Sequence, residues 1–94
     1  MSEKKVDISQ FQFRKGFENV LTEIKEERIP WNKEGLKKEL GDANKLKKKT
    51  RDPNHMGRFA VLSYLYSHFE EFTSRNDGIE KALVKLKEDH ERKT

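Results

Sequence analysis

Lysine side chains gather in one segment of the sequence, where they could bind phosphate groups. Residues 33–51 hold eight basic and three acidic side chains, a net charge of +5, whereas the rest of the chain sums to −1. Each phosphate that a cation neutralises releases condensed counterions, so this segment favours nucleic acid as a partner. The predicted contact residues are Lys37, Lys38, Lys45, Lys47, Lys48, Lys49 and Arg51.

The chemistry of lysine limits how far these contacts could recognise a base sequence. Lysine is a flexible point charge, whereas arginine forks onto the edge of guanine. We therefore expect contacts to the phosphate backbone of DNA or RNA, with little reading of the base sequence. Two alternatives stay open: an acidic protein surface as the partner, and a solvated helix face whose lysines suit the C-terminal end of the helix dipole.

Catalytic and metal-binding patterns are missing from the sequence. His55, His68 and His90 form no pair at the i, i+3 or i, i+4 spacing that holds a metal on a helix. Ser63 and Ser67 lie one helical turn apart, but no Gly-x-Ser-x-Gly motif surrounds either of them. The chain has no cysteine, which excludes thiolate chemistry. We expect a binding protein that is not an enzyme and uses no metal or cofactor.

Length and composition predict one small, highly charged domain over residues 1–94. The 94 residues are 32% hydrophobic and 40% charged, against about 45–50% apolar and about 25% charged in typical globular chains. No apolar run approaches the ~20 residues that span a bilayer. The opening MSEKKVDISQ lacks the apolar region of a secretory signal. We expect an intracellular protein, in the cytoplasm, nucleoid or nucleus, with no membrane contact and with flexible ends at about 1–7 and 88–94.

The elements that position the lysines are predicted to be helices. Breaks at Pro30, Pro53 and Asn76-Asp77-Gly78 divide the chain into four segments of helical periodicity, and none alternates at the period of a strand. The sequence therefore predicts an all-α, four-helix domain. The predicted helices span about 9–28, 33–49 and 53–72, with a fourth after residue 78, and Asn32, Asp52 and Asp77 are the predicted N-caps of the last three.

The second predicted helix presents its lysines outward. Leu36, Leu40, Ala43 and Leu46 form a thin inner stripe, which places Lys38 and its neighbours on the opposite face. We expect this helix to continue through Gly41, although glycine weakens it; the alternative is that Gly41 ends one short helix and Asp42 caps the next. Trp31 is placed as a hydrophobic staple on Leu36.

The third predicted helix, about 53–72, is apolar over more than half of its circumference and should be the central one. Its apolar arc could exceed what three short helices cover, and surplus apolar surface marks an interface. This supports an alternative function as a protein–protein interaction module: an adaptor, inhibitor or assembly subunit of the kind that viruses and mobile elements encode. Its simplest form is a symmetric homodimer, with Tyr64, Tyr66 and Arg58 at the interface.

Overall fold

The computed structural model describes residues 8–92 of the chain, with side chains from residue 10 to residue 88. These residues form four α-helices, a short 3-10 turn and no strand, which confirms the predicted all-α four-helix domain. In chain order the elements are α1 (Ile8–Lys25), α2 (Lys33–Thr50), α3 (Pro53–Ser67), η1 (Phe69–Glu71) and α4 (Arg75–Arg92).

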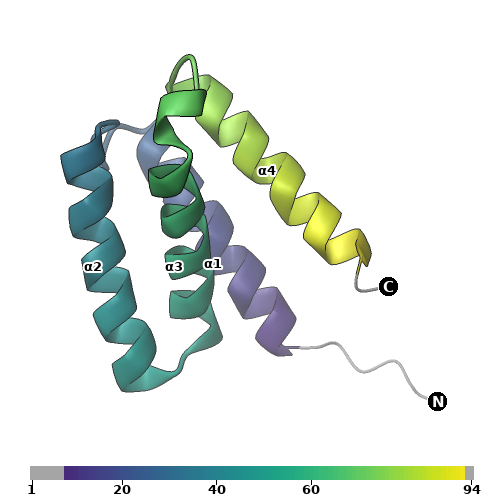
Figure 1. The fold of residues 1–94 in the computed structure, drawn as a ribbon. Coiled ribbons are helices and arrows are strands. Elements are labelled where there is room, and N and C mark those ends of the chain that lie inside the picture. Colours follow the sequence, from purple (N-terminus) through teal and green to yellow (C-terminus); the bar gives the residue numbers. More distant parts are fainter. Residues whose placement is uncertain (1–7, 93–94) are drawn as a thin grey trace.

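Helix α3 lies at the centre, as its apolar circumference predicts. It packs closely on both α1 and α2, whereas α4 makes fewer contacts, with α1 and α3 (Figure 1). Towards its C-terminal end α4 leans away from the other three helices (Figure 1). The core is wholly apolar, and its buried side chains are Phe17, Val20, Leu21, Ile24, Ile29, Leu36, Ala43, Val61, Leu62, Leu65 and Ala82.

Two glycines let α1 and α3 cross in backbone contact. A Cβ atom added to Gly16 of α1 would overlap the carbonyl oxygen of Asn54, and one added to Gly57 of α3 would overlap the carbonyl oxygen of Phe13. Neither obstacle is a flexible side chain that could swing aside. The two missing side chains therefore set the separation of the two helices.

The predicted starts of α2 and α3 are confirmed. The Asn32 side chain accepts a hydrogen bond from the Gly35 N–H at 2.6 Å, and the Asp52 carboxylate accepts one from the Asn54 N–H at 2.9 Å. Pro53 occupies the first turn of α3, where a missing N–H costs nothing. Helix α2 runs unbroken through Gly41, as expected.

The predicted end of the first helix is wrong. Helix α1 ends at Lys25, and a turn through Glu27, at a left-handed φ of 66°, brings Ile29 back into the core at 3% exposure. Burial of Ile29 thus ends the helix a turn before Pro30 would. The Trp31 ring lies near Phe69 and Phe72, with centroid separations of 5.0 and 6.0 Å.

The boundary between the third and fourth predicted helices is also wrong. Helix α3 ends at Ser67, and η1 replaces the predicted last turn. Helix α4 begins at Arg75, because the Ser74 hydroxyl accepts a hydrogen bond from the Asp77 N–H at 3.2 Å. Asp77 therefore lies in the first turn and is not the N-cap.

The Asp77 carboxylate reaches back to accept from the Thr73 N–H at 3.0 Å. This hydrogen bond, with Lys81 nearby, holds the pKa of the carboxyl below its ordinary value of 3.8. The stabilisation from this bond is therefore complete above that value and is lost as the pH falls through the lowered pKa.

Of the predicted flexible ends, residues 1–7 lie outside the described residues, while the backbone of residues 88–92 belongs to α4.

The glycine crossing predicts a large loss of stability from a single methyl group. Gly16→Ala and Gly57→Ala should each lower the free energy of unfolding by about 3 kcal/mol, because the helices must separate to admit the Cβ atom. Urea denaturation followed by circular dichroism measures the loss. Gly41→Ala is the matched control, since its Cβ atom would meet nothing within 4 Å. It should raise stability by up to about 1 kcal/mol. Equal effects at all three glycines would contradict the close crossing.

Candidate nucleic-acid interface

Helix α2 presents a set of exposed lysines on the side away from α3. Leu36 and Ala43 are buried against the core. With 3.6 residues per turn, the opposite side carries five exposed lysines, called the lysine strip below. Its members are Lys37, Lys38, Lys45, Lys48 and Lys49.

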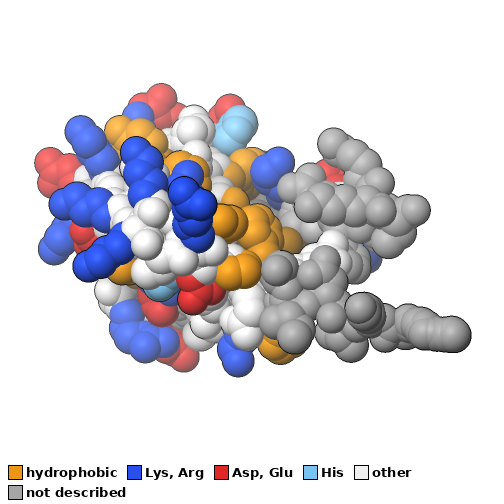
Figure 2. All heavy atoms as spheres, turned by 90° about the horizontal axis from the view of Figure 1, so that it is seen from below, with side chains coloured by type: hydrophobic (Ala, Val, Ile, Leu, Met, Phe, Trp, Pro, Cys, Tyr) orange, Lys and Arg blue, Asp and Glu red, His pale blue; other side chains and the backbone are white. Residues whose placement is uncertain are grey.

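The lysine strip carries charge that no acidic side chain neutralises. Within residues 8–92, no member of the strip forms an ion pair, and neither does Arg51. Some cations elsewhere are paired: Arg14 lies 3.1 Å from Glu18, and Lys81 lies 3.3 Å from Asp77. Seen from the end where α2 meets α3, many Lys and Arg side chains project from one side of the molecule (Figure 2).

Lys47 and Leu46 depart from the predicted arrangement. Lys47 is half-buried, and its Nζ lies 3.9 Å from the centroid of the Phe59 ring of α3, a cation–π contact. Leu46, predicted to point inward, is 41% exposed. Lys47 follows Leu36 by eleven residues, about three full turns, so it occupies the inner face that was assigned to Leu46. The eleven-residue spacing between Leu36 and Lys47 was the feature of the sequence from which this inward position could have been predicted. Lys47 is thus turned towards α3, away from the lysine strip.

Arg51 lies at the end of α2 with its side chain exposed. Its φ of 56° is left-handed, and its N–H donates to the Lys47 carbonyl at 2.9 Å. Thr50 supports the same turn, because its hydroxyl accepts from the Asp52 N–H at 3.2 Å. This turn leads directly into the Asp52 cap of α3 and places the Arg51 charge beside the C-terminal half of the lysine strip.

The two tyrosines predicted at an interface line a different part of the surface. Tyr64 is half-buried, with His68 and Phe72 rings at 4.9 and 5.9 Å, and Lys85 lies over its ring. A shallow hollow beside it is lined by Tyr64, Lys81, Val84, Lys85 and Glu88. Tyr66 is also half-buried and lies beneath Lys33. Both rings therefore pack within the chain.

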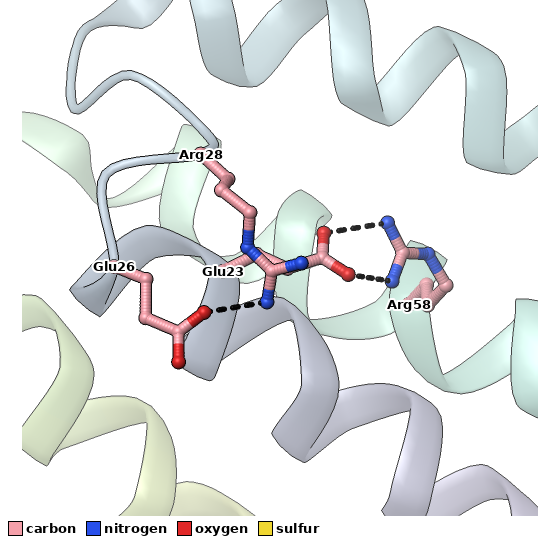
Figure 3. Close-up of polar contacts among 4 residues, drawn as sticks. All are labelled: Glu23, Glu26, Arg28 and Arg58. Carbon is pink, nitrogen blue, oxygen red and sulfur yellow. Dashed lines mark hydrogen bonds and ion pairs between the residues drawn. The ribbon is translucent and has the colours of Figure 1, made fainter.

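Arg58 forms a two-pronged ion pair with Glu23 of α1. Its two terminal nitrogens donate to the two carboxylate oxygens, each at 3.1 Å (Figure 3). The side chains are only 21% and 25% exposed. Arg58, predicted at an interface, is thus bound by a carboxylate of its own chain. The signal for this pair was an arginine inside the apolar arc of α3, which needs a carboxylate partner when the helix is buried.

The surroundings of two of the three histidines are described by the structure. His68 Nδ1 lies 3.1 Å from a Glu71 oxygen, and the half-buried His55 ring has an Nδ1 without a hydrogen-bond partner. The side chain of His90 lies outside the described residues. In the described part of the chain, no three His, Asp or Glu side chains gather closely enough to hold a metal ion. Among these residues there is also no helix with the length and apolarity needed to cross a membrane.

Comparison with known proteins assigns no relationship: no protein-family model matches the chain, and neither does any curated protein or solved structure.

The Arg58–Glu23 pair predicts a measurable coupling between α1 and α3. A double-mutant cycle with Arg58→Met and Glu23→Gln should give a coupling free energy of about 1–2 kcal/mol, because the pair is bidentate and half-buried. Urea denaturation of the four proteins supplies the values. The control cycle uses Arg14→Met and Glu18→Gln, whose exposed pair should couple by less than about 0.5 kcal/mol. Equal coupling in the two cycles would contradict the role given to Arg58.

Proposed function

We propose that this protein binds nucleic acid through phosphate contacts of the lysine strip and Arg51, in a binding role without a catalytic step. The observation that carries the proposal is a set of six exposed cations on α2 and its C-terminal turn, none of which pairs with an acid in the described residues. Elsewhere in the described residues, four arginines form ion pairs with acids, and so do Lys33 and Lys81. An unpaired cluster of one sign raises the local potential and attracts polyanions.

The regular, capped structure of α2 supports a phosphate-binding role. The helix is capped by Asn32, and Leu36 and Ala43 fasten it to the core. The charges therefore stand on a preformed surface, so little backbone order must be gained on binding. Because the strip consists of lysines, we expect it to hold the sugar–phosphate backbone and to tolerate any base sequence.

The burial of α3 and the pairing of Arg58 favour nucleic-acid binding over the alternative function as a protein–protein interaction module. The motivation for that alternative was surplus apolar surface on α3. Met56 is the one large apolar side chain of α3 that is exposed, at 37%; the others are buried or half-buried. Arg58 is already paired with Glu23. Little apolar surface on α3 is therefore left for a protein partner.

Salt dependence tests the proposal directly. Six phosphate contacts predict a slope of about −5 for log affinity against log salt on duplex DNA, at about −0.9 per phosphate. Changing Lys45, Lys48 and Lys49 together to Gln should reduce the magnitude of the slope by about 2.7 and weaken binding equally on unrelated sequences. Fluorescence anisotropy of a labelled duplex and a labelled single-stranded RNA, titrated at several salt concentrations, measures both quantities.

A charge-matched control separates the strip from net charge. Lys25, Lys81 and Lys87 are exposed and lie on α1 and α4; changing all three to Gln removes the same charge and should alter the slope by less than about 1. Poly-glutamate serves as a competitor that represents an acidic protein surface. The proposal fails if neither DNA nor RNA binds at low salt, if both triple variants behave alike, or if poly-glutamate binds more tightly than nucleic acid.

A further inference from the structure

Gly41 lies in the middle of the lysine strip. Residues three and four apart are neighbours on a helix surface, so Lys37 and Lys38 flank Gly41 on the preceding turn and Lys45 flanks it on the following turn. Gly41 is itself exposed. The strip therefore has a patch of bare helix backbone at its centre, bordered by lysines on both sides.

Nothing among the described residues accounts for a glycine at this position. A Cβ atom on Gly41 would meet no atom within 4 Å, and no glycine of the described residues has a positive φ. The other four glycines are all restricted: a Cβ atom would overlap backbone at Gly16 and Gly57, would press on Trp31 at Gly78, and would lie 3.1 Å from the Pro30 oxygen at Gly35. In the interior of an exposed helix, glycine destabilises relative to alanine. Among the five glycines, Gly41 is thus the one that destabilises its helix without allowing any closer packing of the described residues.

We propose that Gly41 is a contact residue of the nucleic-acid site, at which the sugar–phosphate strand lies directly on the backbone of α2. Close approach of a ligand to the backbone is one of the uses to which glycine is suited. The absence of a side chain lets the strand settle between the two groups of lysines. Their flexible stems then reach phosphates on both sides of the crossing point. This inference rests on the proposed function and adds to it the place where the strand crosses the helix.

The lysines around Gly41 agree with this crossing, and the exposed Asp42 next to it points about 100° further around the helix. Lys38 and Lys45 are separated by seven residues, about 10 Å along the helix axis, with Gly41 between them. Any longer side chain at position 41 would hold a strand away from the helix and lengthen all of these lysine contacts together. A lysine strip that served only solubility would be insensitive to such a change, because it needs no close approach.

Two substitutions at Gly41 test the inference by separating stability from binding. Gly41→Ala should raise the midpoint of thermal unfolding by up to about 4–8 °C. Gly41→Gln should raise it less, since glutamine is a weaker helix former than alanine. Binding to the labelled duplex and RNA should change in the opposite direction. Gly41→Gln should weaken it by about fivefold or more, as overpacked contacts do, and Gly41→Ala should weaken it less.

Thr22→Gln is the matched control, because Thr22 is an exposed residue of α1 and the change adds an uncharged side chain outside α2. It should leave binding unchanged. If the lysine triple variant loses affinity while Gly41→Gln binds as tightly as the unaltered protein, the Gly41 contact is wrong and the proposed function stands. If the lysine triple variant has no effect, both fail. A lower melting temperature for Gly41→Ala would also overturn the inference, since Gly41 would then have a structural role.

Discussion

The close crossing of α1 and α3 is the constraint on which the rest of the structure depends. Gly16 and Gly57 each face a backbone carbonyl of the other helix, so the two helices meet without intervening side chains at this level. The same pairing carries the Arg58–Glu23 bridge. Helix α3, once fixed on α1, offers its remaining apolar surface to α2. The direction in which α2 turns its lysines therefore follows from a contact made by two other helices.

The parts of the fold that depend on neighbouring residues in the sequence were predictable. The Asn32 and Asp52 caps are local hydrogen bonds, and the apolar circumference of α3 is visible in its own periodicity. Helix ends set by tertiary burial were not predictable in this way: α1 stops early because Ile29 enters the core. The glycine crossing was also missed, since Gly16 and Gly57 are far apart in the chain and each by itself signals only a weakened helix.

The candidate site shows the same division. The helical period alone places the lysine strip on the side away from Leu36, so its five members could be predicted as a group. It could not be predicted which cations already contact another side chain of the protein. Lys47 lies against Phe59 and Arg58 is bound to Glu23, and both partners come from other helices. The argument for Gly41 as a contact residue likewise depends on the finding that no described residue comes within 4 Å of a Cβ atom at this position, which only the packed structure shows.

The position of the single tryptophan has a practical consequence for studying this molecule. Trp31 sits in the turn between α1 and α2, next to Phe69 and Phe72, and its ring lies over Gly78 of α4. Its indole fluorescence therefore reports the docking of α4 on the other helices, while circular dichroism reports the helical content of the whole chain. Because α4 makes fewer contacts than its neighbours, the two signals could change at different denaturant concentrations. Trp31 is thus an intrinsic fluorescent probe at the point where α4, the helix with the fewest contacts, joins the other helices.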